Sequence, residues 1–114
     1  MGAFVISKRF NGAYKFVFTS RKGKTIFTSA AYNDKQDCLD DIDKLKSNTL
    51  LNTYVKHRAA NGKYFFRLLI DDRLYAGSRK YTTELLLQKG IAEIDRYAAT
   101  AETLDFSESD FVFS

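Results

Sequence analysis

The sequence repeats itself at an offset of about 50 residues, and this repeat limits the possible folds more than any other feature. At an offset of 50, five residues meet identical ones: Val5, Asn11, Gly12, Tyr14 and Phe16 meet Val55, Asn61, Gly62, Tyr64 and Phe66. At an offset of 49, three further identities follow: Ser29, Tyr32 and Ile42 meet Ser78, Tyr81 and Ile91. We therefore interpret the chain as a tandem duplication in which one residue of a turn has been lost.

The first copy begins with three predicted strands. Residues 4–10 are rich in β-forming side chains and end at Asn11-Gly12, a dipeptide that favours a type I′ hairpin turn. In residues 14–19, aromatic side chains occupy every second position, which is the period of a strand with one buried face. A turn at Lys22-Gly23 then leads to a third strand over residues 24–30.

Helical spacing follows the third strand. Cys38, Ile42 and Leu45 recur at steps of four and three, and Asn33 or Asp34 can cap the helix that they predict, which ends near residue 48. The second copy repeats this order, with a helix to residue 98 capped at Thr82 or Thr83. Its strands are expected over residues 54–59, 63–70 and 73–79, with turns at Asn61-Gly62 and Asp71-Asp72.

These elements predict an α+β fold of two β-β-β-α repeats that share one antiparallel sheet, with the helices packed on one face. Repeat one is expected over residues 3–49, repeat two over 53–98 and a closing strand at about 102–106. All three lie within a single domain, 1–106, because 114 residues are too few for two cores of ordinary size. Residues 107–114 are expected to be a C-terminal tail.

The composition excludes several classes of protein. With 45% hydrophobic residues the chain can bury a core, and its one cysteine, Cys38, cannot form an intramolecular disulfide. The sequence contains no zinc-ligand spacing, no apolar run of about 18 residues and no charged-then-apolar leader. We therefore expect a soluble cytoplasmic protein without membrane segments or cofactors, and a monomer, because the duplication already supplies the partner of each repeat.

Three groups of residues resemble the YegP-like family, a mostly bacterial, UPF0339-type domain of unknown function. They are Asn61-Gly62-Lys63-Tyr64-Phe65-Phe66 after an aromatic first strand, Ser78-Arg79-Lys80-Tyr81, and Gly90-Ile91-Ala92 on the second helix. The resemblance covers nearly the whole chain and implies tandem repeats in one sheet, with the strand after each helix exchanged onto the neighbouring repeat. Repeat one departs from the pattern, because Asp41-Ile42 stands where the family often has Gly-Ile. The family supplies no catalytic residues.

Charge is distributed unevenly along the chain. Residues 1–24 carry six Lys or Arg and no acids, whereas the segment from residue 84 to the end carries seven acids and two bases. Residues 54–80 are also basic and the first helix is acidic. If both helices cover one face of the sheet, the other face is expected to be positive.

The uncovered face is therefore the candidate binding surface, since side chains of a strand alternate between faces. The residues assigned to it are Arg9, Lys15, Arg58, Phe65 and Arg67. The favoured function is a non-enzymatic module that binds an unidentified protein partner or other macromolecule through a sheet face or edge. The alternative is nucleic-acid binding, in which aromatic rings stack on bases and cations neutralise phosphates. An isoelectric point near 9.2 is also common in small domains with no such role.

Other motifs favour structural explanations. Gly23-Lys24-Thr25 resembles the end of a phosphate-binding loop, but Phe18 stands where its first glycine is required. Cys38 fits a helix core, and His57 has no second group to form a catalytic pair. The aspartates of the first helix are expected to form a solvated face, and Tyr32 and Tyr81 to pack structurally at strand ends. The sequence thus indicates no catalytic, cofactor or metal site.

Overall fold

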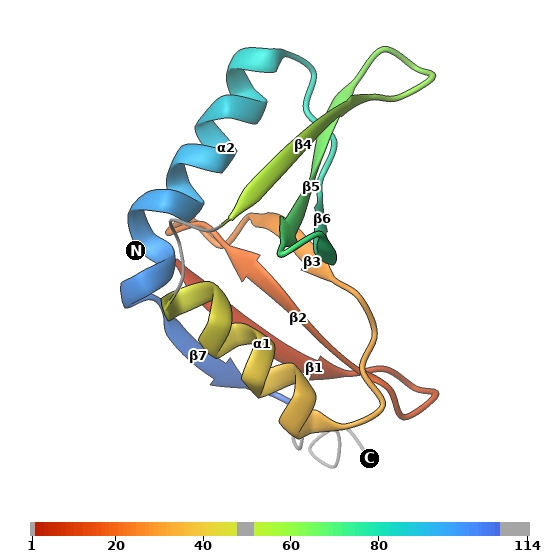
Figure 1. Cartoon of the computed structure of the whole chain (residues 1–114), viewed down its shortest axis with the longest axis vertical. Coiled ribbons are helices and arrows are strands. Elements are labelled where there is room, and N and C mark those ends of the chain that lie inside the picture. The colour runs from red at the N-terminus through yellow and green to blue at the C-terminus, as the bar shows by residue number, and fades with distance from the viewer. Residues whose placement is uncertain (1, 48–51, 108–114) are drawn as a thin grey trace.

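The computed structural model describes residues 2–47 and 52–107 and has an α+β fold (Figure 1). In this part of the chain, one mixed sheet of seven strands is accompanied by two α-helices and a short 3-10 helix. The expected α+β class is thereby confirmed. The strands are β1 (Ala3–Lys8), β2 (Tyr14–Thr19), β3 (Thr25–Ser29), β4 (Thr53–Arg58), β5 (Tyr64–Ile70), β6 (Arg73–Ser78) and β7 (Glu102–Asp105); the helices are α1 (Lys35–Ser47), α2 (Glu84–Tyr97) and η2 (Ala98–Thr100).

The strands follow the spatial order β4-β5-β6-β3-β2-β1-β7. Each pairing is antiparallel except the last, where β7 runs parallel to β1. The prediction of a wholly antiparallel sheet is therefore wrong at this edge. The physical reason is that β1 and β7 are not joined by a tight turn, which would impose an antiparallel pairing. The chain instead passes from β6 through α2 and η2 to the far edge of the sheet, where β7 enters beside β1 and runs opposite to β6.

Both halves of the chain have the same order of elements, three strands and then a helix. They meet where β3 pairs with β6 at the centre of the sheet. The strand that follows each helix lies in the other half, since β4 pairs with β5 and β7 with β1. In Figure 1 the β1–β2 and β4–β5 hairpins consequently extend from different ends of the sheet.

The turns differ from the expected type I′ geometry at the Asn-Gly sites. Gly12 and Gly62 adopt positive φ, but the asparagine side chains instead accept a hydrogen bond from the backbone N–H two residues later. The two-residue turn with positive φ at both positions is Asp71-Asp72, at 51° and 63°. The corresponding connection in the first half, residues 20–24, is a longer loop, and the strands that flank it are each one residue shorter than those that flank Asp71-Asp72.

Both helices cover the same face of the sheet. Phe16, Phe18, Phe66 and Leu68 are fully buried there, and α1 packs on β2 while α2 packs on β5. A bulge in each half alters the alternation, so that Ile26 is buried beside Phe27, and Tyr75 beside Ala76. No helix of the described residues covers the opposite face, which we call the open face.

Candidate functional site

A row of paired residues crosses the open face through all seven strands. Its members, from β4 to β7, are Val55, Arg67, Gly77, Thr28, Val17, Val5 and Leu104. The small residues Thr28 and Gly77 occupy its centre, and a Cβ atom added at Gly77 would meet no atom within 4 Å. The middle of the open face is therefore accessible to another molecule.

The five residues predicted to form a binding surface do not lie together. Lys15, Phe65 and Arg67 lie on the open face, as alternation predicts. Lys15 is nevertheless on β2, and β3 and β6 separate it from β5, which carries the other two. Lys15 also lies close to the turn of the β1–β2 hairpin, whereas Phe65 lies close to the turn of the β4–β5 hairpin. Arg9 lies in the β1–β2 turn, where its N–H bonds to the Ala13 carbonyl oxygen.

Arg58 lies on the helix-facing side, because it pairs with Tyr64, whose ring is 5.5 Å from the Arg58 guanidinium carbon. Three other cations in or next to the strands also contact aromatic rings. The pairs are Lys8 with Tyr14, Arg73 with Tyr75, and Arg79 with Tyr81. The expectation that the basic strands make the open face positive is therefore corrected. Of the six lysines and arginines in the strands, Lys15 and Arg67 lie on the open face, whereas Lys8, Arg58 and Arg73 contact aromatic rings on the helix-facing side.

The open face is more apolar in the second half than in the first. Val55, Phe65, Leu69 and Leu74 form what we call the β4–β6 patch, in which Val55 is 39% and Leu74 51% exposed. The corresponding residues of the first half are Val5, Lys15, Thr19 and Thr25. His57 stacks on the Phe65 ring at 5.0 Å, and Arg67 lies 5.7 Å from its centroid. Both contacts use ring faces that a stacked nucleobase would need.

A pocket lies beside each helix on the covered side. The α1 pocket, about 330 Å³, is lined by Tyr32, Asp37, Asp40, Asp41, Lys44 and Arg73. In it the Tyr32 hydroxyl donates to one oxygen of the Asp41 carboxylate and the Arg73 guanidinium to the other, each at 2.6 Å. Asp41 is buried, so the expectation that the α1 aspartates form a solvated face is wrong for this residue. Burial and the adjacent Asp41 raise the pKa of Tyr32, which keeps the hydroxyl protonated.

The α2 pocket, about 380 Å³, occupies the corresponding place in the second half. Gly90 stands where α1 has Asp41, and a Cβ atom at Gly90 would overlap the Tyr81 hydroxyl oxygen. The glycine thus allows the tyrosine to pack close against α2. The residues that line the α2 pocket are Ser20, Arg21, Lys22, Lys24, Ile26, Arg79, Tyr81, Leu86, Lys89, Gly90, Glu93 and Tyr97.

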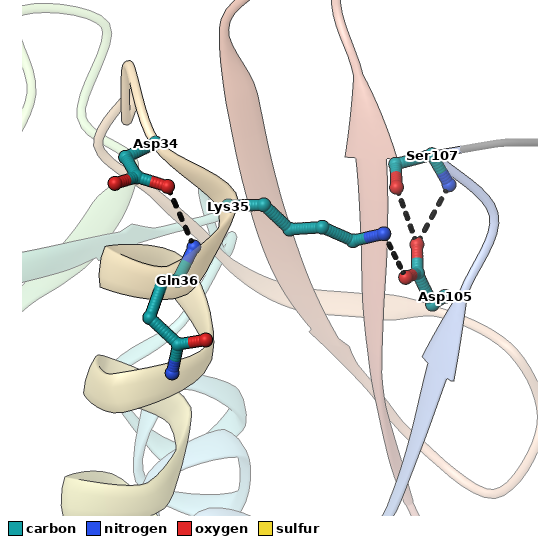
Figure 2. Close-up of polar contacts among 5 residues, drawn as sticks. All are labelled: Asp34, Lys35, Gln36, Asp105 and Ser107. Atoms are coloured by element: carbon teal, nitrogen blue, oxygen red, sulfur yellow. Dashed lines mark hydrogen bonds and ion pairs between the residues drawn. The ribbon is translucent and has the colours of Figure 1, made fainter.

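The start of α1 is joined to the end of β7 by the contacts in Figure 2. Asp34 accepts a hydrogen bond from the Gln36 N–H at the beginning of the helix, and the Lys35 ammonium lies 2.6 Å from an Asp105 carboxylate oxygen. The other Asp105 oxygen accepts from the backbone and hydroxyl of Ser107. Burial opposes ionisation of Asp105, but Lys35 and Ser107 outweigh it, and the pKa of Asp105 is lowered.

The remaining candidate residues have structural surroundings. Cys38 is fully buried in the core, and burial, with Asp41 and Asp105 nearby, raises the pKa of its thiol to about 11. A thiol in this state is a poor nucleophile at neutral pH. Within residues 2–47 and 52–107, no three His, Cys, Asp or Glu side chains gather closely enough to hold a metal ion. In the same residues, each helix is too short or too polar to cross a bilayer.

The sequence reasoning did not identify the two pockets. The signal was present, because the offset that aligns Tyr32 with Tyr81 also aligns Asp41 with Gly90 and Lys24 with Arg73. Its meaning depends on packing, since only the folded chain brings Arg73 of one half to Asp41 of the other.

Comparison with known proteins agrees with this architecture. The family model described as "Domain of unknown function (DUF1508)" matches residues 11–54. The UPF0339 protein YegP of Escherichia coli O6:H1 is 30% identical over 105 residues, covering 90% of this chain and 94% of that protein. This chain belongs to the UPF0339 family. The expected resemblance to the YegP-like family is thereby confirmed.

Solved structures of UPF0339 proteins share the fold. The solution NMR structure of yegP from E. coli, described as a protein of unknown function, has a TM-score of 0.84 at 28% identity and covers 96% of each chain. That of the UPF0339 protein from Shewanella oneidensis has a TM-score of 0.85 at 25% identity and covers 96% of this chain and 94% of its own. The names of these relatives state no activity, ligand or partner.

Proposed function

We propose that this UPF0339 protein is a non-enzymatic binding module that contacts a protein partner through the β4–β6 patch on the open face of its sheet. The observation that carries the proposal is the asymmetry of that face. Four apolar side chains gather on one half, although at three of the four corresponding positions the other half has lysine or threonine. Exposed apolar side chains in a contiguous group are typical of interaction surfaces.

The surroundings of the β4–β6 patch support a protein partner. Gly77 and Thr28 keep the centre of the face low, so a partner can approach the backbone of β6 and β3. Arg67 adds a positive charge beside Val55. Arg67 lies between Phe65 and Leu69 on β5, so the patch combines apolar side chains with an arginine at its centre. Aromatic residues and arginine are enriched in protein–protein interfaces.

Nucleic-acid binding is the second candidate, favoured by Lys15, Phe65 and Arg67 on the open face. Two observations weigh against it: Phe65 is already stacked by His57, and Arg58 lies on the other side of the sheet. It is tested by fluorescence anisotropy of random single-stranded and duplex oligonucleotides at several salt concentrations. Micromolar binding with a steep salt dependence, reduced by Lys15→Glu and Arg67→Glu, would replace the protein-partner proposal.

The test of the main proposal compares Leu74→Glu with Thr25→Glu, its counterpart in the first half. Each immobilised variant and the wild type are used to capture proteins from a lysate of the source cells, followed by quantitative mass spectrometry and calorimetry with the purified partner. We expect Leu74→Glu to weaken binding at least tenfold and Thr25→Glu to change it less than twofold. Equal binding by all three proteins, or no captured partner, contradicts the proposal.

The proposal extends to the origin and state of the molecule. We infer that the two halves arose by tandem duplication of residues 3–49 and 53–98 within one domain, because identical residues recur at corresponding places in both. We also expect a cytoplasmic monomer, in which each repeat has the other as its partner. Sedimentation equilibrium at micromolar concentration checks this, and a dimer mass would contradict it.

A further inference from the structure

The α2 pocket contains part of a polar cluster that is complete in the α1 pocket. In the α1 pocket, the Tyr32 hydroxyl and the Arg73 guanidinium bind the carboxylate of Asp41. The corresponding tyrosine and cation of the α2 pocket are Tyr81 and Lys24, and both line it. The corresponding carboxylate is missing, because α2 has a glycine at that position.

The Tyr81 hydroxyl is a donor at the wall of the α2 pocket, where solvent can reach it. Among the residues that the structure describes, no side chain accepts a hydrogen bond from it, whereas its counterpart Tyr32 donates to Asp41. Burial raises the pKa of Tyr81, with Arg79 acting against this rise and Glu93 adding to it. The hydroxyl is therefore protonated at neutral pH and can donate to an oxygen atom that enters the pocket.

The charge of the α2 pocket fits an anionic occupant. Five cationic side chains line it, with Glu93 as the single carboxylate; the cations are Arg21, Lys22, Lys24, Arg79 and Lys89. At corresponding positions the charges are reversed: Lys89 stands for Asp40, and Glu93 for Lys44. The two pockets have similar size and location but linings of opposite charge, so they are suited to different occupants. A pocket of about 380 Å³ is large enough for a small molecule.

We propose that the α2 pocket binds a small polycarboxylate. One carboxylate of this ligand accepts a hydrogen bond from the Tyr81 hydroxyl and forms an ion pair with Lys24. In the α1 pocket, the Asp41 side chain makes the corresponding two interactions with Tyr32 and Arg73. The remaining negative charges of the ligand pair with Lys89 and Arg21. A carboxylate is the favoured group, because in the other half of this molecule a tyrosine and a cation at the corresponding positions hold one. The site is on the helix side of the sheet, so it is independent of the β4–β6 patch.

The test is a titration of the full ¹⁵N-labelled chain with citrate at neutral pH, followed by NMR, with the ionic strength held constant by sodium chloride. We expect saturable shifts concentrated at the backbone amides of Lys24, Tyr81 and Gly90. Acetate and inorganic phosphate serve as separate arms. Citrate is expected to bind at least tenfold more tightly than acetate, because it can engage several cations.

Paired variants identify the site. Tyr81→Phe removes only the hydroxyl, and Lys24→Gln removes the charge at an exposed position where folding is not at risk. Each is expected to weaken citrate binding about tenfold. Tyr32→Phe is the matched control, since its hydroxyl belongs to the α1 pocket, and it is expected to change the dissociation constant less than twofold. Lys89→Gln provides a second exposed variant should Tyr81→Phe perturb the fold.

The outcomes separate the proposal from its rivals. Shifts that do not saturate, or that spread evenly over the lysines and arginines, would overturn it as nonspecific screening. Phosphate binding more tightly than citrate would overturn the carboxylate assignment. Unchanged citrate binding in folded Lys24→Gln and Lys89→Gln would show that the pocket is not the site.

Discussion

The Asp41 carboxylate has an 8% exposed side chain and two partners, one from its own half and one from the other. A buried carboxylate is stable only when hydrogen bonds and an opposite charge replace its hydration. Tyr32 and Arg73 supply these interactions, and Arg73 reaches α1 from β6. At the corresponding position Gly90 avoids the requirement and leaves Tyr81 without an internal acceptor. The difference between Asp41 and Gly90 therefore decides whether the nearby tyrosine hydroxyl has an acceptor within the chain.

Tyrosine-to-phenylalanine substitutions test this difference residue by residue. Tyr32→Phe leaves a buried carboxylate oxygen without its donor, and we expect it to lower the free energy of unfolding by about 1–3 kcal/mol. Tyr81→Phe removes a hydroxyl with no acceptor among the described residues and is expected to change stability by less than about 0.5 kcal/mol. Urea unfolding measures both, and similar losses in the two variants would contradict the assignment.

At the scale of elements, strands and helices were largely predictable, because alternation and helical spacing report which face of each element is buried. The bulges at Ile26 and Tyr75 were not predictable. A bulge is an extra residue relative to the partner strand, so it depends on how the two strands pair and not on the sequence of one strand. The direction of β7 depends on the path through α2 and η2, which local pattern does not encode. Of the candidate surface, Lys15, Phe65 and Arg67 followed from alternation. Arg58 did not, because its face depends on the register with Tyr64.

The packing of α2 on the sheet depends on a glycine. A methyl group at Gly90 would overlap the Tyr81 hydroxyl, so we expect Gly90→Ala to destabilise the protein by about 1–2 kcal/mol, although alanine favours helix. Gly77→Ala is the control, because a Cβ atom there meets nothing within 4 Å and φ is not positive. We expect this control to be neutral or slightly stabilising. Thermal unfolding followed by circular dichroism compares them, and a stabilising Gly90→Ala would refute the close approach.

At the scale of the whole molecule, the last described strand returns to the first. β7 closes the sheet edge at β1, and the ion pair between Lys35 and Asp105 fixes this strand to the start of α1 (Figure 2). The other edge strand, β4, has one neighbour in the described sheet. The two halves therefore differ in how their outer strands are held, although their inner strands pair in the same way. The pairing of β7 with β1 joins residues 99 apart in sequence, and the ion pair joins residues 70 apart. The contribution of the ion pair can be measured through the titration of Asp105.

The pKa of Asp105 is lower in the folded chain than the ordinary value of an aspartate, 3.8. The ion pair therefore contributes its full stabilisation above about pH 4, and this contribution is lost as the pH falls through the lowered pKa. Asp105→Asn should consequently cost about 0.5–1 kcal/mol at pH 7, a modest value because both side chains are partly exposed to solvent, at 23% and 36%. The difference from wild type should close below pH 4. Glu102→Gln, at the exposed start of β7, is the control and should show no such closing difference. Urea unfolding between pH 3 and pH 7 provides the comparison; a difference that persists undiminished at pH 3 would mean that Asp105 contributes through packing and not through its charge.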